Sequence, residues 1–107
     1  MWEENKKKYA AALGLTDQFE MKGKNMIYTS SNGYMFSMLN KAAEAGVRLS
    51  KEDKAAFHEK YTSDLYKSHG AVMKDYVLIP QELLEQPEEL VQWFVKGFNY
   101  VNTLTPK

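Results

Sequence analysis

The sequence predicts an α+β fold in which antiparallel strands lie between helical segments, in the approximate order α-β-β-β-β-α-β-β-α. Apolar residues recur at helical spacing near both ends of the chain. Between these segments, apolar and polar residues alternate, as they do in strands with one buried face. The dipeptide Asn32-Gly33 separates two such stretches, and this pair favours the tight turn of a β-hairpin.

The composition is that of an ordinary globular domain. The 107 residues are 44% hydrophobic and 26% charged, and this length predicts a single domain over residues 1–107. Fourteen Lys and Arg residues balance fourteen Asp and Glu residues, and this neutral charge argues against a dedicated nucleic-acid binder. The absence of cysteine excludes disulfides and thiolate chemistry. We expect a cytoplasmic protein, because no apolar run is long enough to cross a membrane and no secretory signal is recognisable.

The first segment predicts a helix over residues 2–13, with Gly14 as its natural end. Residues 19–22 alternate between apolar and polar side chains and predict a short, half-buried strand. Gly23-Lys24 then predicts a turn.

Residues 26–31 and 34–39 predict the two strands of the hairpin. A two-residue turn fixes the register, which places Ser31 opposite Tyr34, Thr29 opposite Phe36 and Ile27 opposite Met38. Both faces of this hairpin carry apolar side chains. We therefore expect a sheet that buries one face completely and the other in part.

The middle of the chain predicts a short strand at Val47–Leu49 and then a helix that ends near Tyr61. Ser50 is the expected N-cap, with Asp53 three residues later. Ala56 and Phe57 are expected on the inner side of this helix, together with Tyr61. A short extended piece is expected around residues 65–66, followed by a loop over residues 68–70.

Residues 76–79 form the most β-branched apolar run, which predicts a central strand covered on both faces and ended by Pro80. Residues 81–85 predict one helical turn, and Pro87 is suited to the first position of a longer helix that ends near Thr103.

The helix from Pro87 to Thr103 is more apolar than a surface helix requires. Two explanations are open: the helix is buried within its own domain, or it also contacts a second copy of the chain. The second explanation predicts a homodimer. Its candidate interface residues are Trp93, Phe94, Val95, Phe98, Tyr100 and Val101.

We find no motif that is specific to an enzyme, a metal site or a cofactor site. The histidines His58 and His69 are not at a spacing typical of metal ligands. The carboxylate pairs Glu52-Asp53 and Glu88-Glu89 fall in first turns of predicted helices, where capping and the helix dipole explain them. We therefore expect a non-enzymatic protein that needs no cofactor and no metal.

Two alternatives to a protein-interaction role are open. One is a ligand-binding or enzymatic pocket built from dispersed residues with polar tips, namely Tyr28, Tyr34, His69 and Tyr76. The other is weak nucleic-acid binding through Lys6–Lys8, Lys22 and Lys24.

Several short stretches, in this order and at this spacing, resemble one family over roughly residues 9–107. They are Met21-Lys22-Gly23, Asn32-Gly33-Tyr34-Met35-Phe36, Val47–Asp53, Met73–Pro80 and Leu104–Lys107. The set is similar to the N-terminal domain of TfoX/Sxy, the bacterial competence regulators.

The resemblance implies a curved antiparallel sheet flanked by helices, of the secretion-chaperone-like type, and often a dimer. It also implies a regulatory role as a transcriptional coactivator that acts with the cyclic-AMP receptor protein. It implies no catalytic residues.

Overall fold

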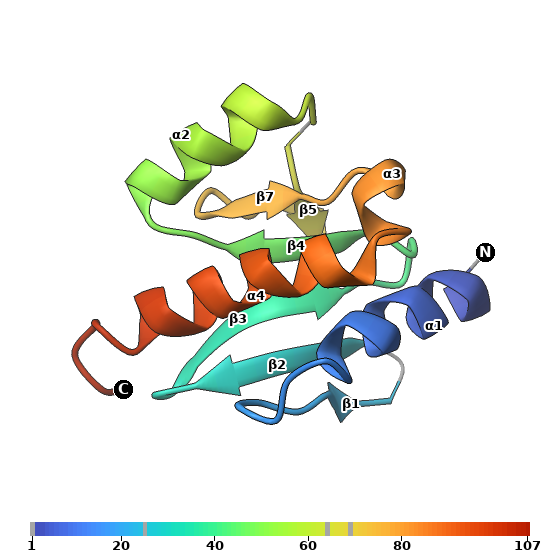
Figure 1. Cartoon of the computed structure of the whole chain (residues 1–107). Coiled ribbons are helices and arrows are strands. Elements are labelled where there is room, and N and C mark those ends of the chain that lie inside the picture. Colours follow the sequence, from blue (N-terminus) through green and yellow to red (C-terminus); the bar gives the residue numbers. More distant parts are fainter. Residues whose placement is uncertain (1, 25, 64, 69) are drawn as a thin grey trace.

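The computed structural model describes residues 2–24, 26–63, 65–68 and 70–107 (Figure 1). Over these residues the chain has an α+β fold with a five-stranded antiparallel sheet in the order β1-β2-β3-β4-β7. A separate hairpin forms a two-stranded sheet, β5-β6. The elements are α1 (Trp2–Leu13), β1 (Lys22–Gly23), β2 (Ile27–Ser31), β3 (Tyr34–Leu39), β4 (Ala45–Arg48), α2 (Lys51–Lys60), β5 (Lys67–Ser68), β6 (Ala71–Val72), β7 (Tyr76–Leu78), α3 (Gln81–Leu84) and α4 (Pro87–Val101).

The expected α+β class is confirmed, and α1 has the predicted bounds. Helix α2 begins as predicted, because the Ser50 side chain accepts a hydrogen bond from the backbone N–H of Asp53 at 3.1 Å. The expected strand at residues 19–22 is wrong in its position, because only Lys22–Gly23 pairs with β2. Phe19 instead packs into the core, with its ring centroid 5.0 Å from that of Phe36. The expected inward position of Ala56 is also wrong, because this residue is exposed.

The hairpin register is as predicted at the turn and wrong beyond it. Ser31 pairs with Tyr34, but Thr29 pairs with Ser37 and Ile27 pairs with Leu39. The register shifts between Thr29 and Ser30, since β3 carries one extra residue there. Such a bulge cannot be inferred from turn length. Its consequence is that Phe36 and Ser37, although adjacent, both contact residues of the helical side of the sheet.

The strand at residues 76–79 is not central, contrary to the prediction. β7 is at the edge of the sheet, where it pairs only with β4. Its apolar character has a different cause, because layers on both sides cover it. Val77 and Ile79 belong to the core under the helices, whereas Tyr76 belongs to a smaller cluster on the opposite face. An edge strand covered on both faces has the same hydrophobic pattern as a central one.

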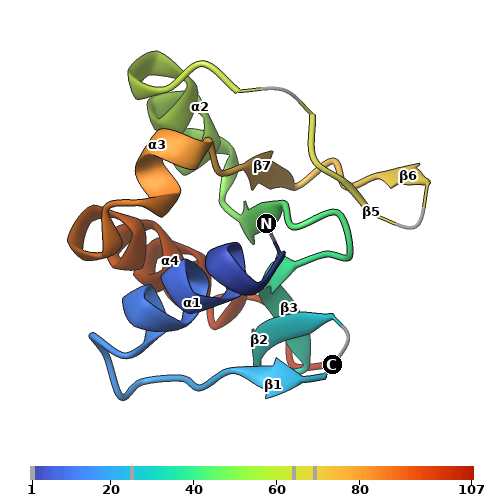
Figure 2. The same cartoon turned by 90° about the vertical axis from the view of Figure 1, so that its right-hand side faces the viewer.

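The helices cover one face of the sheet, and α4 lies between α1 and α2 on this face (Figure 1). We call the opposite face the second face. Figure 2 views the strands nearly end-on and shows the β5-β6 hairpin on the second face, opposite the helices. The hairpin covers this face only in part, as expected, but the helical face is not completely buried, because Tyr34 on it is half-buried.

Among the described residues, no helix has the length and apolar character that crossing a membrane requires.

Candidate functional site

The six predicted interface residues on α4 largely pack within their own chain. Phe94, Val101 and Trp93 are buried. Trp93 meets the ring of Phe57 from α2 at 5.0 Å, and Phe94 meets the ring of Tyr9 from α1 at 5.4 Å. Val95, Phe98 and Tyr100 are half-buried against the same core. The apolar excess of this helix therefore follows from its contacts with the sheet and with two neighbouring helices.

The part of α4 that faces solvent is polar. Its exposed residues are Glu88, Gln92, Lys96 and Asn99. These positions recur at helical spacing and form one stripe along the helix. The structure thus leaves little apolar surface on α4 for a second copy.

The described residues of the predicted pocket are divided between the two faces of the sheet. Tyr34 lies on the helical side, where its hydroxyl donates a hydrogen bond to the carbonyl oxygen of Thr105 at 2.7 Å. Tyr28 and Tyr76 lie on the second face. His69 is outside the described residues. None of the three described tyrosines lines the surface hollows at the N-terminal end of α4, along α1 or beside the β3-β4 connection.

Tyr66 and Tyr76 build the covered half of the second face. Their rings stack at 5.8 Å, and the Tyr76 hydroxyl donates to the carbonyl oxygen of Met35 at 2.8 Å. The Tyr66 hydroxyl donates to the carbonyl oxygen of Glu44 at 3.0 Å. Burial raises the pKa of both phenols above the ordinary value. These tyrosines are neutral structural groups and are not poised as acids or bases.

The second face is only half covered. Met26, Tyr28 and Met35 are half-buried beside the tyrosine pair. Val72, on the covering hairpin, is 43% exposed. Gly46 lets the Tyr66 ring lie close to the sheet, since a Cβ atom there would be 2.7 Å from the ring. The outcome is an apolar surface of methionine and aromatic side chains next to a rigid aromatic pair.

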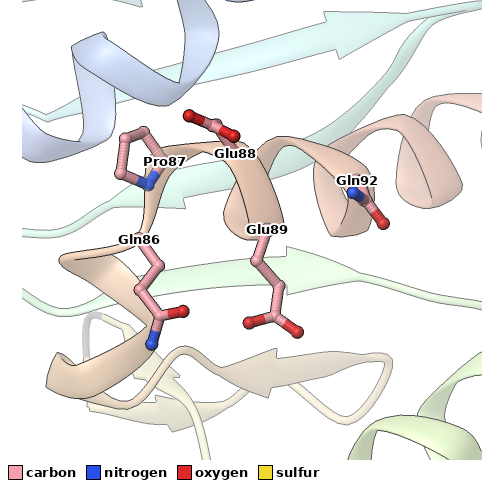
Figure 3. Close-up of a pocket in the computed structure, with 5 residues that line it drawn as sticks. All are labelled: Gln86, Pro87, Glu88, Glu89 and Gln92. Carbon is pink, nitrogen blue, oxygen red and sulfur yellow. The ribbon is translucent and has the colours of Figure 1, made fainter.

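A hollow of about 440 Å³ lies at the N-terminal end of α4 (Figure 3). Its two carboxylates do not converge, because the side chains of Glu88 and Glu89 point in opposite directions (Figure 3). Glu89 also forms an ion pair with Lys60, and this hydrogen-bonded contact holds the pKa of Glu89 below its usual value. Glu89 therefore joins α4 to α2 and is not available as a catalytic pair with Glu88.

The lysines that sequence reasoning grouped together are separated in space. Lys8 forms an ion pair with Glu85 at 3.2 Å, and Lys7 lines the same flank of α1. Lys22 donates to the Ser30 hydroxyl at 3.2 Å. Lys6 and Lys24 meet at a different place, where they line a hollow with Trp2 and Lys41. We call this set of four residues the lysine hollow.

Sequence reasoning missed Lys41 and Trp2 as parts of one site. The spacing of Trp2 and Lys6 places them one helical turn apart, and this is the one signal that the sequence offers. Lys41 joins them only because the β3-β4 connection returns to the N-terminal end of α1 (Figure 2).

Metal chemistry finds no support in the described part of the chain, where no group of three or more His, Asp or Glu side chains could hold an ion. His58 is exposed on α2.

No family model, no curated protein and no solved structure matches the chain.

Proposed function

We propose that the chain is a non-enzymatic protein-interaction module that works as a homodimer through the second face of its sheet. The observation that carries this proposal is the incomplete cover of that face. Helices α1, α2 and α4 and a large core cover the first face, whereas the small β5-β6 hairpin leaves Met26, Tyr28 and Met35 half-buried. An apolar surface of this kind on a folded protein marks an interaction site.

Methionine and tyrosine suit such a surface. Methionine side chains are flexible and polarisable and adapt to a partner, and tyrosine buries a large ring at little conformational cost. The stacked Tyr66 and Tyr76 rings lie beside this area and fix its shape. The surface is thus adaptable at its centre and rigid at its border.

The charge balance favours a second copy as the partner. Fourteen basic and fourteen acidic residues give a net charge of zero, so two copies have no overall repulsion to overcome. The solvent-facing stripe of α4 is polar. We therefore place the proposed dimer contact on the second face and not on this helix.

Light scattering coupled to size-exclusion chromatography tests this proposal with two matched variants. Met35→Lys places a charge in the proposed contact, and Gln92→Lys places the same charge on the exposed stripe of α4. We expect a dimer for the parent chain and for Gln92→Lys, and a monomer for Met35→Lys with an unchanged circular dichroism spectrum. A parent chain that is monomeric at high micromolar concentration would exclude the dimer. A dimer that persists in Met35→Lys would exclude this surface.

The resemblance to TfoX/Sxy supports a regulatory role for this module, with a transcription regulator as a further partner. Purification of the tagged protein from its own cells tests this role. Recovery of a transcription regulator with the parent chain, and its loss with Met35→Lys, is the expected result. Recovery of metabolic enzymes alone would argue against regulation.

A further inference from the structure

The lysine hollow gathers positive charge from three separate parts of the chain. Lys6 comes from α1, Lys24 follows the last residue of β1, and Lys41 comes from the β3-β4 connection. Together with Trp2 they line a hollow of about 400 Å³. These elements meet at the end of the molecule that faces the viewer in Figure 2.

The three amines have no carboxylate partner within the described residues. The ion pairs found there involve Lys8, Arg48 and Lys60. No carboxylate of the described chain lines the hollow beside these three lysines, so a bound anion there would meet positive charge alone. The unpaired lysines are therefore the complement of a negatively charged ligand.

Two of the lysines are held on fixed supports. The Lys6 ammonium lies over the Trp2 ring at 5.3 Å, and the Trp2 indole N–H donates to the carbonyl oxygen of Asn40 at 3.2 Å. This hydrogen bond ties the lysine-bearing end of α1 to the residue that precedes Lys41. The backbone positions from which Lys6 and Lys41 extend are thus set before any ligand arrives.

Hydrogen bonds also hold the connection that carries Lys41 in place. The Asn40 side-chain oxygen accepts hydrogen bonds from the backbone N–H groups of Ala42 and Glu44, both at 3.0 Å. The Asn5 side chain donates to the carbonyl oxygen of Ala43 at 2.8 Å. Ala43 has a φ of 67°, a left-handed conformation that is costly for a residue with a side chain. Such strain persists where the surroundings hold it and is concentrated at functional sites.

We propose that the lysine hollow binds a small phosphate-bearing molecule with at least two negative charges. Lysine ammonium groups recognise phosphate as point charges and tolerate varied oxygen positions. A diphosphate can engage amines that approach from three directions. A neighbouring hollow shares Lys41 and is also lined by Met26 and Ala42, whose apolar side chains suit an uncharged remainder of such a molecule.

A nucleic acid is the less favoured source of the phosphate. Lys7, Lys8 and Lys22 lie outside the hollow, so the positive charge does not extend along a strand-sized path. The net charge of zero points the same way.

Calorimetric titration of the full chain with inorganic pyrophosphate at low salt tests the proposal. Lys6→Gln and Lys41→Gln each remove one charge from the hollow. Lys7→Gln is the matched control, since it removes the same charge from the next position of the same helix. We expect each hollow variant to weaken binding by about tenfold, the double variant to abolish it, and Lys7→Gln to bind as the parent chain does.

Either of two results with pyrophosphate would overturn the proposal. One is the absence of pyrophosphate binding by the parent chain at millimolar concentration. The other is an equal loss of affinity in Lys6→Gln and Lys7→Gln, which would indicate a diffuse charge effect. A short single-stranded DNA provides a second arm. Tighter binding of DNA than of pyrophosphate, with a steep salt dependence and an equal loss in Lys6→Gln and Lys7→Gln, would contradict the proposed ligand. It would indicate that these lysines bind nucleic acid.

Discussion

At the scale of single residues, Ser37 shows how one small polar group organises the core. Its hydroxyl is buried and makes hydrogen bonds with the hydroxyls of Tyr9 at 2.6 Å and Thr29 at 2.5 Å. Tyr9 comes from α1 and Thr29 from β2, so this chain of hydroxyls joins the first helix to the sheet. Burial raises the pKa of Tyr9 above the ordinary value, and the group therefore stays protonated and able to donate.

Removal of the central hydroxyl is expected to cost more than removal of a terminal one. Ser37→Ala deprives two buried hydroxyls of a partner and should lower the free energy of unfolding by about 2–3 kcal/mol. Tyr9→Phe leaves the Thr29–Ser37 hydrogen bond intact and should cost about 1 kcal/mol. Urea unfolding followed by circular dichroism measures both. Ser31→Ala, on an exposed hydrogen bond with Asn102, is the control and should change little. Equal costs for the two buried variants would contradict the shared role of Ser37.

At the scale of elements, the close approach of α4 to the sheet explains its sequence. Gly97 faces β4, and a Cβ atom there would be 2.7 Å from the carbonyl oxygen of Arg48 and 3.0 Å from a methyl group of Val47. The helix also meets α1 and α2 through Phe94 and Trp93. Contacts on three sides of the helix require apolar residues on those sides. The polar stripe occupies the remaining side, which faces solvent.

Gly97→Ala should destabilise the protein although alanine is the better helix former. The added methyl group overlaps a backbone atom that cannot move aside, and overpacking of this kind costs about 1–3 kcal/mol. This cost exceeds the gain in helix propensity of about 1 kcal/mol. Asn99→Ala, exposed on the same helix, should instead stabilise slightly. Thermal unfolding compares the two, and a higher melting temperature for Gly97→Ala would refute the close contact.

At the scale of the whole molecule, buried tyrosines hold both faces of the sheet. Tyr9 belongs to the core under the helices, and Tyr66 and Tyr76 belong to the cluster on the second face. Burial raises the pKa of all three above the ordinary value of 10.0. These tyrosines therefore lose their protons more readily when the layers that bury them unfold.

The free energy of unfolding that these buried tyrosines contribute is expected to be complete below pH 10 and to decrease as the pH rises further. Above the ordinary tyrosine pKa the unfolded chain releases protons that the folded chain retains, so alkali favours unfolding. Each tyrosine contributes about 1.4 kcal/mol per pH unit, or about 4 kcal/mol per pH unit for three. Tyrosinate absorbance and circular dichroism measured together test this. Ionisation of all tyrosines near pH 10 with native dichroism would contradict the burial.

Much of the element pattern could be predicted from local chemistry. The bounds of α1, the turn at Asn32-Gly33, the Ser50 cap and the start of α4 at Pro87 follow from residues next to one another. The bulge in β3 and the edge position of β7 could not be predicted in this way, because both depend on which strands pair.

For the candidate sites, too, some features follow from the sequence and others depend on the tertiary structure. The sequence by itself determined a neutral α+β protein without cysteine, with a hairpin that is apolar on both faces and a helix that is apolar on more than one side. Only the tertiary structure decided that α4 uses this surface within its own chain and that the second face of the sheet stays half covered. It also decided that Lys6, Lys24 and Lys41 line one hollow together with Trp2. The physical reason is that periodicity shows which side chains avoid water, whereas chain topology decides which of them, and which charges, come together.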